Sequence, residues 1–253
     1  MLALTHLPSS KLQACERTFV AHEEIDYERA LTQHAAYCDA LRACRVRVVT
    51  LNVNADQPDS TFIEDIAVVL DEVAVLASMG TASRRDEPRA IEPIIREHRE
   101  MVRIESPATL EGGDVLRVGR TLLVGTSCRT NHAGIALFAA IVERFGYRVM
   151  PIPIRECLHL KTACTVLPDG RLLINPAWIN KSALTDFDLI EIPTDEPWAA
   201  NVCLVNSNML LPAAHARTAN LIDSLGFAIR AVELSEFAKA EGGVTCLSLL
   251  INE

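Results

Sequence analysis

The chain has 253 residues, of which 49% are apolar and only 5% aromatic, so it can bury a large core that must be mainly aliphatic. A net charge of -9 argues against a nucleic-acid partner, whose phosphates need clustered Lys and Arg, and it suits a cationic small molecule. The longest uncharged apolar run, around Gly134 to Val142, is too short to span a bilayer, so we expect no membrane partner.

The cysteines predict a reducing compartment. The first residues lack the basic n-region and the long apolar stretch of a signal peptide, so the eight cysteines are expected to be reduced thiols of a cytoplasmic protein. Cys157, His159 and Cys164 lie close together, but the chain has no C-x-x-C and no paired H-x-x-x-H spacing of a zinc site. It has no Walker A or G-x-G-x-x-G sequence either, so we expect neither a metal nor a cofactor.

Helical patterns and strands alternate along the chain. The first pattern places Ala30, His34 and Leu41 on one face of a helix. Four segments show such a pattern and each leads into an apolar strand: helices at 27–44, 88–99, 130–145 and 213–225, with strands at 45–53, 101–106, 147–154 and 227–234. The segment 180–185 is at best a weak helix before a strand at 187–193.

Apolar hairpins complete these units. They open at five places, in steps of 49, 45, 42 and 45 residues: Asp65, Asp114, His159, Asn201 and Cys246. The third hairpin contains P-D-G, a strong turn sequence. The regular period indicates an internal repeat, and no unit can bury its apolar face alone. We therefore predict an α/β fold of five pseudo-symmetric units packed around one axis, as a single domain over residues 1–253; an ordinary open α/β sheet is the alternative.

Equivalent positions of a radial repeat converge on its axis. The hairpin openings carry acids, a histidine, an amide and a thiol: Glu64 and Asp65, Glu111 and Asp114, His159, Asn201, and Cys246. This is the set that a cysteine nucleophile needs to attack a cationic carbon centre. A free thiol has a pKa near ~8.5, and a bound cation or a nearby imidazolium would lower it.

The other side chains have matching roles. His159 can protonate a leaving amine and then deprotonate water, and Glu111 can orient and charge the imidazole. Asp65 can accept the N–H groups of a guanidinium. Taken singly, the plainer interpretations are stronger: Cys246 and His159 as core residues, the acidic pairs as turns. Their coincidence at equivalent positions favours the catalytic interpretation.

Seven motifs make the chain resemble dimethylarginine dimethylaminohydrolases of the pentein, or guanidino-group-modifying, superfamily. In chain order they are P-D-S-T-F-I-E-D (58–65), S-R-R-D-E (83–87), T-L-E-G-G-D-V-L (109–116), R-T-N-H-A-G (129–134), L-H-L-K-T (158–162), A-A-N-V (199–202) and G-G-V-T-C-L-S-L (242–249). The match runs nearly end to end, and L-H-L-K with the terminal T-C-x-S is highly specific.

The resemblance implies a five-bladed α/β propeller with a metal-free active site in its central channel. It assigns Cys246 as nucleophile, His159 as general acid/base and Glu111 as the partner of His159. It assigns the remaining residues to the substrate: Asp65 with Glu64 to the guanidinium, Asp59 to the α-amino group, Arg84 and Arg129 to the α-carboxylate.

The implied reaction is attack of Cys246 on the guanidino carbon of an Nω-methylated arginine. Methylamine or dimethylamine leaves, a thiouronium forms, and water releases citrulline. The family also uses an N-terminal lid, expected here within Leu7 to Phe19. One departure lies before Arg84, where the usual T-R-P-G-A is replaced by Ala-Ser-Met-Gly-Thr at 77–81; we expect it to affect how Arg84 is held.

Three alternatives remain within the superfamily. Arginine deiminases and amidinotransferases share the core residues, although deiminases generally carry an extra helical domain for which this chain has no room. A non-catalytic pentein that serves as a binding module is more remote, because it would have lost the Cys, His and acid set. A homodimer is compatible with the sequence.

Overall fold

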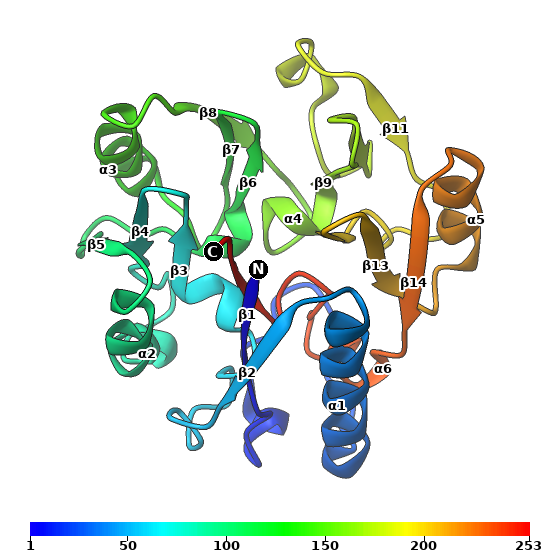
Figure 1. Ribbon diagram of the computed structural model, residues 1–253, viewed down its shortest axis with the longest axis horizontal. Coiled ribbons are helices and arrows are strands. Elements are labelled where there is room, and N and C mark those ends of the chain that lie inside the picture. Colours follow the sequence, from blue (N-terminus) through cyan, green and yellow to red (C-terminus); the bar gives the residue numbers. More distant parts are fainter.

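Five three-stranded sheets surround a central axis in the computed structural model, which describes residues 1–253 (Figure 1). The sheets are β1 (Leu2–His6), β2 (Arg47–Leu51) and β15 (Leu249–Ile251); β3 (Ala67–Val69), β4 (Val73–Leu76) and β5 (Glu100–Arg103); β6 (Val115–Val118), β7 (Thr121–Thr126) and β8 (Arg148–Pro153); β9 (Cys164–Val166), β10 (Leu172–Ile174) and β11 (Leu189–Glu191); β12 (Cys203–Val205), β13 (Asn208–Pro212) and β14 (Ala228–Val232). The predicted five-unit α/β propeller is confirmed.

Every sheet has the same connectivity. Its middle strand pairs antiparallel with one neighbour and parallel with the other. A parallel pair needs a crossover, which a helix usually supplies. Four crossovers are the helices α1 (Tyr27–Ala43), α2 (Glu87–Arg96), α3 (His132–Glu143) and α5 (Ala216–Ser224). The fifth, between β10 and β11, contains only the short turn η5 (Lys181–Ala183), as expected for the weak segment 180–185.

The two ends of the chain close the ring. Strand β1 lies between β15 and β2, with Leu2 opposite Ile251 and Leu4 opposite Leu249. These four side chains are buried, and Figure 1 shows both termini near the axis. The last strand is therefore paired within the core, and the residues just before it reach the axis instead of a frayed end.

Two helices begin where side chains cap them. Asp26 accepts a hydrogen bond from the Arg29 N–H at 3.0 Å and starts α1. Asn131 accepts one from the Gly134 N–H at 2.8 Å, so α3 begins two residues later than the pattern predicts. Such caps satisfy N–H groups that have no partner within the helix. None of the helices is both long and apolar enough to cross a bilayer.

Candidate active site

Short helical turns precede the first strands of three sheets and carry the candidate residues to the axis. The turn η2 (Ile63–Ile66) leads into β3 and holds Glu64 and Asp65, and η4 (Gly112–Asp114) leads into β6 directly after Glu111. The four-residue helix α4 (Leu160–Ala163) leads into β9 directly after His159. These turns contact one another, so the predicted convergence of equivalent repeat positions is observed.

His159 and Glu111 form a buried pair. His159 Nε2 lies 2.8 Å from Glu111 Oε2, and His159 Nδ1 lies 3.7 Å from Asp65 Oδ1. Burial by itself lowers the pKa of His159, but Asp65, Asp114 and Glu111 outweigh it and raise the pKa to about 9. Burial also acts to raise the pKa of Glu111, but the hydrogen bond and charge of His159 prevail and lower it to about 2. The pair is therefore an imidazolium and a carboxylate at neutral pH.

The close approach of these groups depends on Gly113. A Cβ at this position would lie 2.6 Å from His159 Nδ1 and 2.7 Å from Asp65 Oδ1. The Gly113 N–H also donates to Asp65 Oδ1 at 3.2 Å. Any side chain here would push His159 and Asp65 apart.

Arg84 is buried and most of its donors are taken. Its guanidinium donates to both carboxylate oxygens of Glu87, to Asp65 Oδ2 at 2.7 Å and to the Phe62 carbonyl. A guanidinium has five N–H donors, so one N–H of Nη1 is left. None of these partners belongs to residues 77–81, so the expectation that this stretch holds Arg84 is not met.

The same stretch instead contacts Arg129 and Glu111. Arg129 Nη1 donates to Thr81 Oγ1 at 3.0 Å and lies 3.9 Å from Glu111 Oε1. The Gly80 N–H donates to Glu111 Oε1 at 2.9 Å. Arg129 is as buried as Arg84 but keeps more free N–H donors, which suits it to an anionic group of a ligand.

Cys246 is partly buried in the loop that precedes β15. Its carbonyl accepts from the Glu64 N–H at 3.2 Å, and its Sγ lies 3.4 Å from the Gly243 nitrogen. Burial, followed by the charges of Glu64 and Asp65, raises the pKa of the Cys246 thiol to about 12. Without a ligand the thiol is therefore neutral, and a cation between it and these carboxylates would favour the thiolate.

A polar network joins Glu64 to the Cys246 loop. Lys161 Nζ bridges Glu64 Oε1 at 2.6 Å and the Gly112 carbonyl at 3.1 Å. Thr245 Oγ1 donates to Glu64 Oε2 at 2.8 Å and accepts from Asn201 Nδ2 at 3.0 Å. Five units of the repeat thus meet through these groups. Sequence reasoning assigned no role to Lys161 or Thr245, although each stands in a quoted motif beside a candidate catalytic residue.

Asp59 lies next to the N-terminal segment. It is buried and accepts from the Glu16 N–H at 3.2 and 3.3 Å. Burial raises the pKa of Asp59 to about 6, against the opposing effect of Arg84. All eight candidate residues therefore lie in or beside one cluster around the axis.

The cluster offers one set of possible metal ligands. Ligand atoms of Asp65, Glu111 and His159 lie within 4.8 Å of one another. Two of these three side chains are already partnered with each other and the third with Arg84, so the arrangement is satisfied by ion pairs. Cys157 and Cys164 are buried and burial raises the pKa of both thiols, which disfavours the thiolates that zinc requires.

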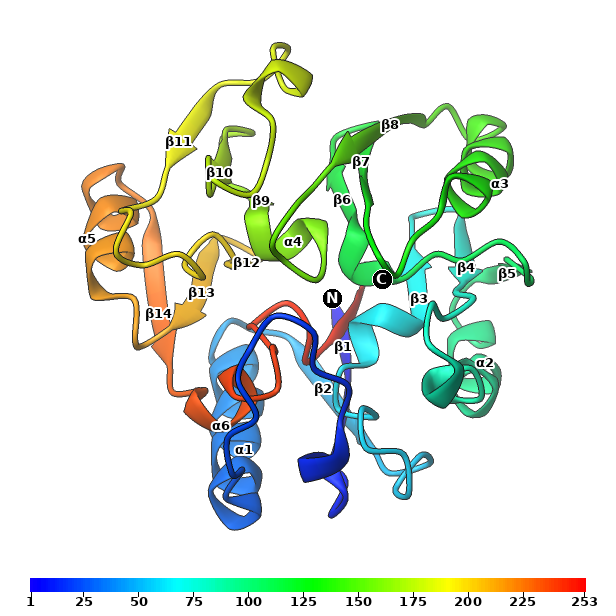
Figure 2. The same ribbon diagram turned by 180° about the vertical axis from the view of Figure 1, so that it is seen from behind.

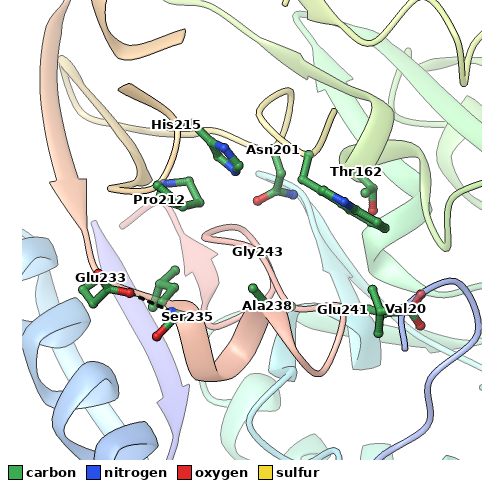
Figure 3. A pocket seen from close by; sticks show the side chains of 14 residues that line it. Val20, Thr162, Asn201, Pro212, His215, Glu233, Ser235, Ala238, Glu241 and Gly243 are labelled. Carbon is green, nitrogen blue, oxygen red and sulfur yellow. Dashed lines mark hydrogen bonds between the residues drawn. The ribbon is translucent and has the colours of Figure 1, made fainter. Parts of the chain in front are cut away.

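A cavity of about 150 Å³ borders this cluster (Figure 3). Asn201 and Gly243 face it from the side of the candidate site, and Val20, His215 and Glu241 line it elsewhere. Neither Cys246 nor His159 lines it, so it adjoins the reaction centre without containing it.

Comparisons with known proteins identify the family of this chain. The family model for eukaryotic N,N dimethylarginine dimethylhydrolase matches residues 8–182. The N(G),N(G)-dimethylarginine dimethylaminohydrolase of Pseudomonas aeruginosa is 38% identical over 226 residues, which cover 88% of this chain and 89% of the relative. That of Streptomyces coelicolor is 39% identical over 256 residues, which cover 99% and 97%. The chain belongs to the dimethylarginine dimethylaminohydrolase family.

Solved structures of this family have the same fold. The Pseudomonas aeruginosa enzyme, as a cysteine-to-serine mutant complexed with citrulline, superposes with a TM-score of 0.93 at 35% identity, over 98% of this chain and 97% of the other. A dimethylarginine dimethylaminohydrolase histidine-to-glycine adduct with S-methyl-L-thiocitrulline gives the same score. The N-terminal domain of a cyanobacterial arginine dihydrolase, at 20% identity and a TM-score of 0.84, shares the fold.

Proposed function

We propose that this member of the dimethylarginine dimethylaminohydrolase family hydrolyses Nω-methylated arginine to citrulline and dimethylamine or methylamine. The reaction passes through a thiouronium intermediate on Cys246, with His159 as the general acid and base. One observation carries the assignment of residues: the adjacent acids Glu64 and Asp65 lie between the two groups, with Asp65 Oδ1 3.7 Å from His159 Nδ1 and the Glu64 N–H donating to the Cys246 carbonyl at 3.2 Å. It supports a site in which thiol and imidazole flank a cation.

Binding would activate the nucleophile. The free thiol is held neutral by burial and by Glu64 and Asp65. A guanidinium bound to these carboxylates would cancel their effect and add a positive charge, so the thiol of Cys246 would lose its proton to solvent when substrate is present. The resulting Sγ would attack the guanidino carbon and form a tetrahedral adduct.

His159 is charged and ready to donate a proton. As the C–N bond to the methylated nitrogen breaks, the imidazolium would give its proton to the departing amine. The neutral imidazole would then take a proton from water, whose oxygen attacks the thiouronium carbon. Cleavage of the C–S bond, with transfer of the remaining hydroxyl proton to the departing sulfur, would release citrulline and regenerate the Cys246 thiol. Glu111, 2.8 Å from His159, would orient the ring and stabilise its charged form.

The ends of the substrate would be held by further charges. Asp59 would accept the α-amino group, and Arg129 would bind the α-carboxylate through its free N–H donors. Arg84 has one free N–H for the same group and otherwise would fix Asp65 and Glu87. Glu64, paired with Lys161, would lie on the guanidinium side.

Product analysis tests this proposal. The protein is incubated separately with asymmetric dimethylarginine, monomethylarginine, arginine and agmatine, and citrulline, ammonia and alkylamines are measured. We expect citrulline and dimethylamine from asymmetric dimethylarginine. Turnover of arginine alone would identify a deiminase. A sequence similarity supports this second candidate: an arginine deiminase of Listeria welshimeri is 30% identical over 149 residues, which cover 53% of this chain and 37% of that enzyme.

We also propose that residues 1–253 form a single domain. We propose in addition that the protein is located in the cytoplasm. All eight cysteines are free, which fits a reducing compartment. Fractionation of cells that express the protein at native levels, followed by immunoblotting of each fraction, tests the location.

A further inference from the structure

The segment between η1 (Leu12–Ala14) and α1 runs beside the loop that leads to Cys246. Figure 2 shows this blue segment next to α6 (Ser235–Ala238) and the red loop that follows it. At one point the Glu16 N–H donates to Asp59. Two residues later the segment meets Glu241, so it crosses from one part of the candidate site to another.

Glu241 holds the middle of this segment through its backbone. The Glu241 carboxylate accepts from the Thr18 N–H at 2.6 Å and from the Phe19 N–H at 2.5 Å. The side chains of Thr18 and Phe19 are exposed, with Phe19 at 42%, and make no hydrogen bond of their own. Side-chain packing therefore contributes little at these two residues. Their neighbours are held by the Glu16 bond to Asp59 and by Arg17, which donates to the Gln13 and Glu23 carbonyls, whereas Thr18 and Phe19 are themselves held by the two bonds to Glu241.

The carboxylate in turn depends on the segment. Glu241 is buried at 8% exposure and has no Lys, Arg or His partner in an ion pair. A buried carboxylate needs hydrogen bonds to offset its lost hydration, and its donors are the N–H groups of Thr18 and Phe19. If the segment opened, the Glu241 carboxylate and the N–H groups of Thr18 and Phe19 would all be exposed to water. The two hydrogen bonds can therefore form and break together.

The backbone of Glu241 is strained. Its φ is +59°, a left-handed conformation that a non-Gly residue adopts at a cost of about 1 kcal/mol or more. Glycine would fit this position without that cost, and glycine does occupy the next two positions. A glutamate in a conformation that favours glycine indicates that the interactions of its side chain compensate for the strain.

Glu241 is also coupled to the nucleophile loop. The next residue, Gly242, donates its N–H to the Phe237 carbonyl at 2.8 Å, and a Cβ on Gly243 would lie 2.2 Å from Asn201 Oδ1. The six residues from Glu241 to Cys246 are therefore tightly packed. Figure 3 shows Glu241 beside Val20, a residue of the same N-terminal segment, at one end of the cavity.

We propose that Glu241 is a positioning residue that latches the N-terminal segment closed over the active site and ties this closure to the Cys246 loop. The inference rests on the proposed function for its kinetic consequence only, since the latch itself is measurable without substrate. Loss of the latch leaves the closed form less populated. Because the apparent affinity scales with the closed fraction, KM rises while kcat changes less.

Amide hydrogen exchange and trypsin digestion test the latch. The variants are Glu241→Gln, which puts an NH₂ group against one N–H donor, and Glu241→Gly, which removes the carboxylate and relieves the positive φ. Glu233→Gln is the matched control, because Glu233 lines the same cavity but bonds only to the Ser235 N–H. Exchange at Thr18 and Phe19 and cleavage after Arg17 should accelerate about tenfold or more in both Glu241 variants and stay unchanged in the control.

Stability separates the latch from a merely structural role. Glu241→Gly should unfold at a temperature close to that of the native protein, since relief of the positive φ offsets part of the loss of the two hydrogen bonds. With asymmetric dimethylarginine we expect KM to rise about tenfold in both Glu241 variants and kcat to stay within about threefold.

Three results would overturn the proposal: native exchange at Thr18 and Phe19 in both variants; faster exchange with unchanged KM; or a fall of kcat without a change of KM. A native protein that turns over no methylated arginine would refute the proposed function, and the exchange and trypsin data would still decide whether the latch exists.

Discussion

Nearby carboxylates raise the pKa of both His159 and Cys246, with opposite effects on the charge of the two side chains. Asp65 contributes to both, joined by Glu111 and Asp114 at the histidine and by Glu64 at the cysteine. Negative charge raises either pKa. For the imidazole this means a cation at neutral pH, ready to donate a proton, whereas for the thiol it means a neutral, unreactive group. In the proposed mechanism, one acidic pocket thus keeps His159 charged and Cys246 neutral until a cationic substrate binds.

The two regions also differ in how they are built. His159 is in direct contact with charged partners, and its environment is complete without a ligand. Cys246 Sγ has only a backbone N–H and a hydroxyl as hydrogen-bond partners and packs against the apolar core, and its pKa depends on carboxylate charge that a substrate would neutralise. Reactivity of Cys246 towards neutral compounds is therefore suppressed by the same carboxylates that are proposed to bind the cation.

The largest expected effect comes from the nucleophile. Cys246→Ser should lower kcat by about 10⁴-fold or more, because an alcohol in this position lacks an adequate base. Binding of asymmetric dimethylarginine, measured by calorimetry, should persist since the carboxylates are intact. A serine variant with full activity would show that the reaction does not use this sulfur.

Glu111→Gln removes the charged partner of His159. Activity should fall about 10²-fold, because the ring loses its orienting partner. The pKa of His159, followed by NMR of the imidazole, should drop below its native value of about 9. The native pKa is raised above the unfolded value of about 6.5, so His159 stabilises the fold fully below pH 6.5 and the effect is lost as pH rises through about 9.

The variant should lose less stability over this alkaline range, as measured by thermal unfolding at fixed pH values between 6 and 10. An unchanged His159 titration in Glu111→Gln would mean that Asp65 and Asp114 alone hold the charge.

Substitutions of Arg84 and Arg129 should have different effects, the first on the stability of the fold and the second on substrate binding. Arg84→Lys breaks a buried cluster with Asp65 and Glu87 and should cost about 3 kcal/mol of unfolding free energy. Arg129→Lys should leave stability nearly unchanged and raise KM about tenfold. Denaturant unfolding and steady-state kinetics on both variants check this. Equal effects on KM with no loss of stability would place both arginines on the substrate.

The smallest expected effect concerns the pKa of the Cys246 thiol. Glu64→Gln should lower the pKa of Cys246 below about 12 and speed its alkylation by iodoacetamide at pH 8 several-fold. Lys161→Gln is the matched control, because removal of the cation beside Glu64 should slow the same reaction. Peptide mapping distinguishes Cys246 from the exposed Cys128. Slower alkylation in Glu64→Gln would contradict an electrostatic role for this carboxylate.

Much of the fold was predictable because its signals are local. Helical periodicity over three or four turns and hairpins at steps near 45 residues depend on neighbours in sequence, and both were confirmed. The strand β1 and the short helices α4 and α6 were not predicted, and the other errors lie at the ends of elements. The helix expected from Ala213 begins at Ala216, since the Ala213 N–H still bonds to the Val232 carbonyl at the end of the β13–β14 pair.

The candidate site was predictable as a set of residues but not as a network. Repeat equivalence and motifs singled out His159, Glu111 and Cys246. They could not show that Glu87 and Asp65 occupy most of the donors of Arg84, or that Thr81 bonds to Arg129. Hydrogen-bond partners depend on side-chain directions, which a sequence pattern does not encode.

The five-unit repeat, the order of its main helices and hairpins, and the candidate catalytic residues were predictable from the sequence alone, because each follows from local periodicity or from a short motif. Only the tertiary structure decided how the ring closes, with β1 placed between β15 and β2. It alone also decided that Glu241 meets Thr18 and Phe19 across more than 200 residues of chain. Contacts of this kind arise when distant segments pack together, and no local pattern records them.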